Sequence, residues 1–253
     1  MTSTYKTSLL GLGRVGLVLA LLGASVASAA GQSMQRGSAM DRSSHGMASG
    51  TAQEVAPKAV VGPVTGQALV EHLRQGGLIL WMRHGARDDR PGEVTDAQAA
   101  AHNCAQQSQL TAKGQTQARA VGAGMRALNL PIARVNAARL CRTETTARLL
   151  NVGPVHTEAR LDAASTWKDR GGDAAYENAI AALLSNAPPP GKDVVDVTSK
   201  LTTAHPEPAV LAALSPGEVA VFAPDPDGPP RLLARIGRRA WPELARESGS
   251  SSQ

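Results

Sequence analysis

The tripeptide Arg83-His84-Gly85 carries the strongest chemical signal in the sequence. It comes directly after the run from Leu78 to Met82, whose length and apolar character predict a strand buried on both faces. Ligands of open α/β sheets bind beyond the carboxyl ends of the strands, so this position favours a binding site. An imidazole nitrogen can attack phosphorus while a guanidinium holds phosphate oxygens. The tripeptide therefore indicates a phosphate site.

A lone histidine is more often structural, so this interpretation depends on the cationic residues that accompany His84. Arg87 and Arg142 supply further guanidinium groups. Nearby positive charges favour the neutral imidazole, which is the nucleophilic form.

Other sequence patterns exclude several classes of site. Gly11-Leu12-Gly13-Arg14-Val15-Gly16 matches a dinucleotide fingerprint, but no strand precedes it and it lies in a segment that we expect to be removed. Neither cysteine is followed by Arg six residues later, and the chain has no GxSxG elbow and no P-loop. It also has no CxxC, HExxH or EF-hand pattern, so we expect neither a metal nor a cofactor.

The composition predicts one domain with an aliphatic core. The chain has 253 residues, of which 42% are hydrophobic and 19% charged. Only three Trp, two Tyr and one Phe are present, which argues against stacking on single-stranded nucleic acid. The formal charge of +5 falls to +3 without Lys6 and Arg14 of the leader, so we expect no nucleic-acid partner and no membrane partner beyond the leader.

The first 29 residues resemble a secretory signal peptide in their order of parts. A short basic start precedes the apolar run from Val15 to Leu22, and small residues then allow cleavage after Ala29. The apolar run is too short for a comfortable membrane span, so we expect an exported protein, periplasmic or extracellular. An uncleaved N-terminal anchor is the alternative.

The remaining chain divides by composition. Residues 30–56 are rich in Gly, Ser, Met and Gln and are predicted to be a disordered linker, as are residues 247–253 as a tail. Residues 57–246 form the predicted domain. Apolar spacing and end signals predict the helices 65–75, 111–128, 143–150 and 173–185, and the strands 78–82, 133–136, 194–198, 218–222 and 232–236. This alternation predicts a single three-layer α/β domain with a mostly parallel central sheet flanked by helices.

Four segments together resemble the histidine phosphatase superfamily, whose members are similar to phosphoglycerate mutase. Leu78–Gly85 is similar to its first strand and Arg-His-Gly motif. The stretches 103–118 and Leu140–Ala147 resemble the Cys-Gln-Leu-Thr-Gly-Gln-Ala and Cys-Arg-Thr-Glu-Thr-Ala patterns of an exported bacterial branch, and Gly217–Asp225 also fits. The resemblance covers roughly residues 75–236, and the combination is specific although each piece is weak.

The resemblance implies a role for each matching residue. His84 would carry the phosphoryl group, Arg83 and Arg142 would bind its oxygens, and Gly85 would let the backbone approach them. Arg87 is a further candidate for phosphate binding. The family has a second histidine after a later strand, and here Ser199 follows the strand 194–198.

Two interpretations of Ser199 remain open. Its hydroxyl can donate one hydrogen bond to phosphate but supplies no imidazolium charge, and losing one preorganised donor typically costs a factor of about 100 to 1000 in rate. Alternatively, His205 reaches the pocket from the loop that follows. For the proton donor, the resemblance implies a carboxylate, and Asp162 is the first candidate, ahead of Glu158 and Asp88.

Cys104 and Cys141 are the only cysteines. Export favours a disulfide between them, which would stabilise the fold by about 4 kcal/mol in the chain-entropy model. Two buried thiols are the alternative.

These observations predict an exported phosphomonoester hydrolase that acts without metal through a phosphohistidine on His84, on a small phosphorylated substrate that the sequence does not identify. A degenerate member that binds a phosphorylated or anionic ligand without turnover is the alternative. A structural module of the cell envelope is a third hypothesis.

Overall fold

The computed structural model describes residues 60–88, 103–203 and 208–250. The strands are β1 (Val60–Val61), β2 (Ile79–Arg83), β3 (Ile132–Ala137), β4 (Val155–Thr157), β5 (Asp193–Thr198), β6 (Val219–Ala223) and β7 (Arg231–Ile236). The α-helices are α1 (Gly66–Gln75), α3 (Ala112–Ala127), α4 (Cys141–Leu150), α5 (Gly172–Ser185) and α6 (Trp241–Ser250). Short 3-10 helices are η1 (Cys104–Gln106), η2 (Ala159–Leu161), η3 (Ala164–Arg170) and η4 (Ala209–Ala213).

The strands form one sheet in the order β1-β7-β6-β2-β5-β3-β4. Strands β2, β5, β3 and β4 pair in parallel, whereas β6 pairs antiparallel with β2 and β7, and β1 antiparallel with β7. The predicted α/β class is confirmed, and the parallel part is the half that contains β5 and β3. Strand β2 therefore lies at the centre, between a parallel and an antiparallel neighbour.

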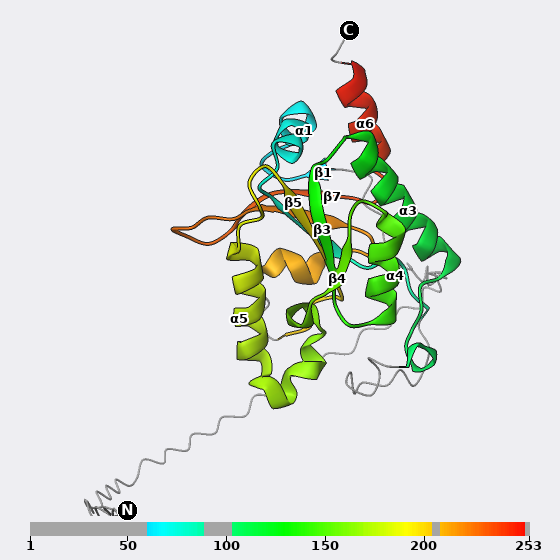
Figure 1. The fold of residues 1–253 in the computed structure, drawn as a ribbon, viewed down its shortest axis with the longest axis vertical. Coiled ribbons are helices and arrows are strands. Elements are labelled where there is room, and N and C mark those ends of the chain that lie inside the picture. The colour runs from blue at the N-terminus through cyan, green and yellow to red at the C-terminus, as the bar shows by residue number, and fades with distance from the viewer. Residues whose placement is uncertain (1–59, 89–102, 204–207, 251–253) are drawn as a thin grey trace, which may run out of the picture. The chain divides into compact units, whose positions relative to one another are not determined.

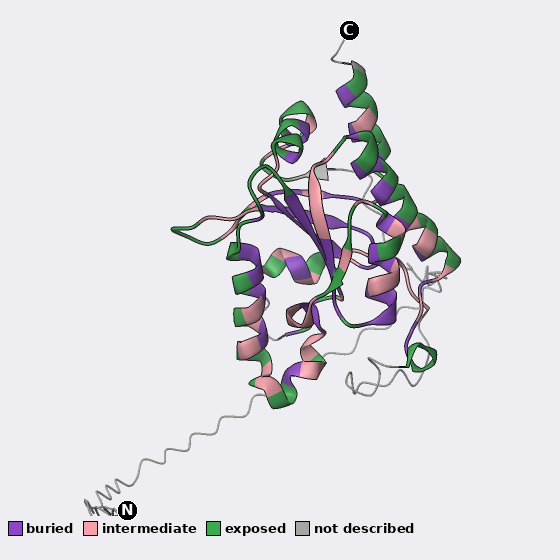
Figure 2. Ribbon diagram, viewed as in Figure 1, coloured by how far each residue is buried: buried purple, intermediate pink, exposed green. Residues whose placement is uncertain are grey.

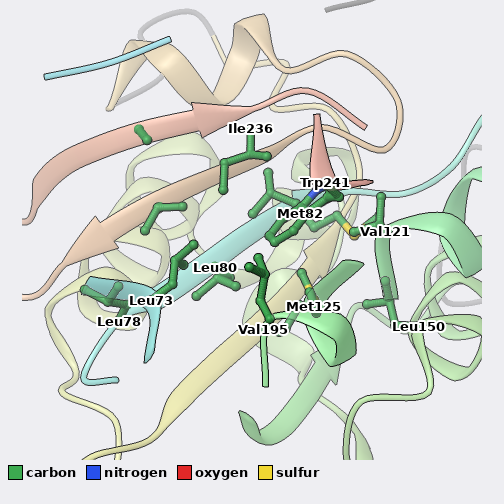
Figure 3. Close-up of a cluster of buried hydrophobic side chains, with 14 of the residues drawn as sticks. Leu73, Leu78, Leu80, Met82, Val121, Met125, Leu150, Val195, Ile236 and Trp241 are labelled. Atoms are coloured by element: carbon green, nitrogen blue, oxygen red, sulfur yellow. The ribbon is translucent and has the colours of Figure 1, made fainter. Parts of the chain in front are cut away.

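Helices cover both faces of the sheet, with α5 on one side and α3 and α4 on the other (Figure 1). Successive side chains of a strand point to opposite faces. Leu80 and Met82 of β2 accordingly pack with residues of α1, α3, α4 and α6, a cluster in which Figure 3 shows Met125 and Trp241. Ile79 and Trp81 pack on the opposite face with residues of α5, η2, η3 and η4. The central strands are buried on both faces, as Figure 2 shows.

The helices α1, α3, α4 and α5 lie at the predicted positions, whereas α6 was not predicted. Thr111 precedes α3, and its hydroxyl accepts a hydrogen bond from the Gly114 N–H at 3.0 Å, which satisfies one of the helix's free donors. No helix of the described residues is both long enough and apolar enough to cross a membrane.

The C-terminal prediction is wrong in one respect. Residues from Glu247 were predicted to be a disordered tail, but α6 continues to Ser250. Ser248 is buried, accepts a hydrogen bond from Arg74 at 3.3 Å and donates one to the Ala245 carbonyl at 2.9 Å. These contacts hold the end of the helix against α1. The predicted leader and linker lie outside the described residues.

Candidate active site

His84 follows β2 directly, at the carboxyl edge of the sheet's centre. Its backbone N–H donates to the Thr198 carbonyl of β5 at 3.0 Å, and the Gly217 N–H donates to the carbonyls of both Arg83 and His84 at 3.0 Å. The residue is only 2% exposed. Hydrogen bonds to the segments on both sides thus fix its backbone.

The His84 ring is held in one tautomer. Its Nδ1 lies 2.7 Å from the Gly85 carbonyl oxygen, which can only accept, so Nδ1 carries the proton and donates. Nε2 then keeps its lone pair. The pKa of His84 is lowered from 6.5 to about 3, chiefly by burial and also by the charges of Arg142, Arg83 and Arg87, whereas the hydrogen bond with Gly85 acts to raise it. The imidazole is therefore neutral and nucleophilic at Nε2 at neutral pH.

The loop after His84 rests on the start of α3. A Cβ on Gly85 would lie 2.5 Å from the Gly114 carbonyl oxygen, and one on Gly114 would overlap the Ala86 carbonyl. Only glycine fits at either position. The Gly85 N–H donates to Thr146 Oγ1 at 3.2 Å, and the Ala86 N–H to Gln117 Oε1 at 3.1 Å. Side chains from α4 and α3 thus position the loop.

Arg142 and Ser199 are in contact. Arg142 is 7% exposed in the first turn of α4, and its Nη2 donates to Ser199 Oγ at 3.3 Å. The Thr146 hydroxyl, which accepts from Gly85, donates to the Arg142 carbonyl at 2.8 Å. The contact joins two residues that the sequence assigned to phosphate binding, and the charge of Arg142 acts on His84.

Arg83 and Arg87 contribute charge from the two ends of the loop. Arg83 donates from Nη1 to the Leu214 carbonyl at 2.8 Å and is half-buried. The Arg87 backbone forms an isolated bridge with Leu110.

Asp162, the predicted proton donor, contacts two arginines. Its Oδ1 accepts from the Arg139 backbone N–H at 2.8 Å, and its Oδ2 accepts from Arg139 Nε at 2.9 Å and Nη2 at 2.6 Å. Arg170 Nη1 lies 3.7 Å from the same oxygen. A proton donor needs a protonated oxygen directed at the leaving group, so these contacts favour a structural role.

The other predicted acids also have partners. Glu158 pairs with Arg160, whose Nη2 lies 2.7 Å from its Oε2, and hydrogen bonds from Arg160 lower the Glu158 pKa. Asp88 accepts from the Gln109 N–H at 2.8 Å. His205 lies outside the described residues.

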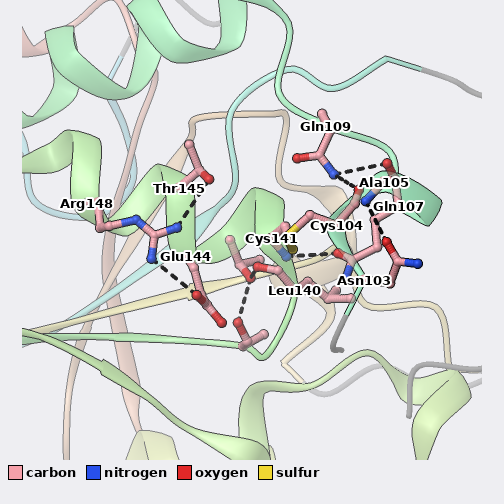
Figure 4. The surroundings of a disulfide bond; sticks show 12 residues. Asn103, Cys104, Ala105, Gln107, Gln109, Leu140, Cys141, Glu144, Thr145 and Arg148 are labelled. Atoms are coloured by element: carbon pink, nitrogen blue, oxygen red, sulfur yellow. Dashed lines mark hydrogen bonds and ion pairs between the residues drawn. A yellow bond between two sulfur atoms is a disulfide. The ribbon is translucent and has the colours of Figure 1, made fainter. Parts of the chain in front are cut away.

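The cysteines form the predicted disulfide, Cys104–Cys141, with Cα atoms 5.6 Å apart (Figure 4). It joins η1 to the first residue of α4. Gln107 accepts from the Cys141 N–H at 2.8 Å and reinforces the connection. Because Arg142 is the next residue, the disulfide anchors the helix turn that carries the main cation of the site.

Sequence reasoning missed the residues that support the site. Thr146 lies one helical turn after Arg142, a spacing that places both on one face of α4. Gln117 is part of the Gln-Ala stretch that was noted only as a family pattern.

Two buried acids on β5 were also missed. Burial raises the pKa of Asp193 to about 7, against the hydrogen bond that its Oδ1 accepts from Leu78 at 2.9 Å. Burial also raises the pKa of Asp196 to about 6, although Asn136 donates to Asp196 at 2.7 Å. Both precede the carboxyl end of β5. In the described ranges, no three His, Cys, Asp or Glu side chains are grouped so that they could hold a metal ion.

Comparison with known proteins identifies a family for this chain. The sequence profile of the histidine phosphatase superfamily (branch 1) matches residues 79–222, more than half of the chain. No curated protein matches.

Several solved structures are similar at low identity. The protein histidine phosphatase SixA complexed with tungstate has a TM-score of 0.45 and 15% identity, over 64% of this chain and 97% of that chain. A phosphoserine phosphatase from Entamoeba histolytica in complex with 3-phosphoglyceric acid has a TM-score of 0.42 and 16% identity, over 63% and 96%. A Thermus thermophilus protein has a TM-score of 0.40 and 21% identity, over 63% and 99%.

Proposed function

Because the chain belongs to the histidine phosphatase superfamily, we propose that it hydrolyses phosphomonoesters through a phosphohistidine formed on His84. The observation that carries the proposal is the state of the His84 ring. Nδ1 donates to the Gly85 carbonyl, the pKa is lowered to about 3, and Nε2 is left as a neutral nucleophile.

In the proposed reaction, Nε2 forms a bond to phosphorus as the bond to the leaving oxygen breaks. The leaving oxygen takes up a proton, and water then attacks phosphorus, breaks the N–P bond and releases phosphate. Arg142, Arg83 and Arg87 would neutralise the charge on the phosphoryl oxygens. No metal enters these steps.

Ser199 supports a second form of the proposal, in which the site binds a phosphorylated or anionic ligand with little turnover. By the family resemblance, a histidine would stand at this position. The hydroxyl that is present accepts a hydrogen bond from Arg142 and brings no positive charge. Transition-state stabilisation should therefore be weaker than with an imidazolium.

Hydrolysis of an aryl phosphate in the presence of a chelator tests both forms. The mature protein is compared with His84→Ala, Ser199→His and His156→Ala, the last removing an exposed histidine of β4 as a matched control. Activity lost in His84→Ala and kept in His156→Ala supports hydrolysis. An inactive wild type with an active Ser199→His supports the binder. No activity in any variant, with no protection by vanadate against thermal unfolding, overturns both.

Export is part of the proposal. The leader-like sequence of residues 1–29 and the disulfide Cys104–Cys141 support it, because disulfides persist in oxidising compartments. Mass spectrometry of the protein from fractionated cells should find Ala30 as the first residue outside the cytoplasm. An intact leader on a cytoplasmic protein would refute cleavage and export together.

A further inference from the structure

Arg139 is fixed on one edge of its guanidinium and open to solvent on the other. Asp162, whose side chain is 6% exposed, accepts from Arg139 Nε and Nη2 and from the Arg139 backbone N–H. The Arg139 side chain is 48% exposed. A guanidinium has five N–H donors, and in the described part of the chain no residue accepts from those of Arg139 that Asp162 leaves.

This pair lies at the same edge of the sheet as His84. Arg139 follows β3 by two residues, and the intervening Ala138 N–H donates to the Val197 carbonyl of β5 at 3.0 Å. On the other side of β5, the His84 N–H donates to the carbonyl of the next residue, Thr198. The carboxyl ends of three adjacent parallel strands thus bring both residues to one edge.

Asp162 is anchored to this edge as well. Leu161, its neighbour, accepts a hydrogen bond from Thr198 Oγ1 at 2.9 Å. Arg170, which approaches the Asp162 carboxylate at 3.7 Å, stacks at 3.8 Å over the ring of Trp167 and is less exposed than Arg139. The Asp162 carboxylate therefore lies next to two arginines, of which Arg139 is the more exposed to solvent.

A fixed and exposed guanidinium suits a carboxylate or a phosphate. Its planar donors match two oxygens, and its position is already ordered, so binding an anion costs little side-chain entropy. Arg142, three residues later, is buried in the site. This edge of the sheet therefore combines a buried cation, Arg142, for the reacting phosphate with an exposed cation, Arg139.

We propose that Arg139, held in place by Asp162, binds a second anionic group of the substrate, which is then a phosphomonoester that also carries a carboxylate or another phosphate. The inference rests on the proposed function. Asp162 acts in it as a positioning residue.

Matched esters test this inference. Phenyl phosphate is compared with its ortho-, meta- and para-carboxyphenyl analogues and with propane-1,3-diol bisphosphate, by kcat and KM or, without turnover, by calorimetric Kd. The mature wild type should prefer at least one of the esters with a second anionic group over phenyl phosphate by about tenfold. This factor corresponds to about 1.4 kcal/mol of binding free energy. Arg139→Gln should abolish this preference and leave kcat on phenyl phosphate unchanged, whereas Arg139→Lys should retain part of it.

Two further variants separate recognition from folding. Arg160→Gln removes an equally paired arginine that is 42% exposed and should keep the preference. Arg139→Gln/Asp162→Asn avoids leaving a buried carboxylate with fewer partners, and it should lose the preference without a large fall in melting temperature.

The outcomes distinguish this inference from the proposed function. If phenyl phosphate is bound or hydrolysed but no ester is preferred, or if Arg139→Gln keeps the preference, the second subsite is refuted while the phosphate site stands. If no phosphate ester is bound at all, the proposed function fails and the subsite fails with it.

Discussion

Replacing His84 by Asn should remove the pH dependence that this buried ring imposes on stability. The folded protein keeps the ring neutral down to a pKa of about 3, whereas the unfolded chain takes up a proton below its ordinary 6.5. The unfolded state therefore binds more protons between these values, and the free energy of unfolding falls as the pH falls. Linkage gives a loss of about 2 kcal/mol at pH 5 and about 3 kcal/mol at pH 4, relative to pH 8.

The Asn side chain is chosen because its amide can still donate to the Gly85 carbonyl, as Nδ1 does, but does not titrate. The smaller side chain should lower stability by the same amount at every pH. The difference between wild type and His84→Asn should therefore shrink by about 2 kcal/mol from pH 8 to pH 5. All other titrating groups are common to both proteins and cancel.

The assay is urea unfolding followed by circular dichroism, in buffers without phosphate at constant ionic strength. The measurement at pH 8, where His84 is neutral in both states, gives the pH-independent cost of the substitution. A difference between the two proteins that is the same at pH 8 and pH 5 would refute the lowered pKa, and with it the argument that burial keeps the imidazole of His84 neutral.

Three other substitutions probe the site and its frame. Gly85→Ala places a Cβ 2.5 Å from the Gly114 carbonyl oxygen. It should lower the free energy of unfolding by about 1–3 kcal/mol and weaken phosphate binding at least about tenfold. An unchanged affinity for phosphate in calorimetry would contradict the argument that the contact between Gly85 and Gly114 positions the site. Cys104→Ser/Cys141→Ser opens a link of sequence separation 37 and should lower the unfolding free energy by about 4 kcal/mol in urea; equal stability would show that the link does not constrain the unfolded chain. Asp193 has its pKa raised to about 7 by burial, so the contribution of this residue to wild-type stability falls as the pH rises from about 4 to 7, and Asp193→Asn should gain about 4 kcal/mol relative to wild type over that interval. A constant difference between the two proteins in urea titrations at pH 4 and pH 8 would be inconsistent with the raised pKa.

The centre of the fold, and the place of His84 directly after its central strand, could be predicted from local sequence. The apolar run before Arg83 has the length of a buried strand, and β2 is found there. The start of α3 after Thr111 and the end of α1 before Gly76, which has a positive φ of 74°, likewise depend on neighbouring residues only. The direction of β6 could not be predicted in this way, because a strand's own pattern does not encode which way its neighbours run. Strand β4 was missed because it is short and two of its three residues are exposed.

The cationic residues of the candidate site could be predicted from the sequence, whereas most of the contacts between its side chains could not. Arg142 and Ser199 were assigned from the family resemblance, and the structure brings them within hydrogen-bond distance. The partners of Asp162 were not foreseen, because Arg139 and Arg170 come from segments without periodic pattern and meet it only through tertiary packing. A carboxylate next to a predicted site can therefore be either a proton donor or a structural partner of arginines, and sequence alone does not separate these two roles.

The central place of β2 has a consequence for how the protein is made. Its neighbours β5 and β6 come much later in the chain, and β5 and the two residues before β6 supply groups that bond to the backbone around His84. Such long-range pairings form slowly, after loop closure. During synthesis, the proposed phosphate site therefore cannot form until nearly the whole domain has emerged, so truncated chains that end before β6 should bind no ligand. A phosphate ester that binds only the finished fold would then act as its stabiliser by mass action, and its binding can serve as a reporter of completed folding.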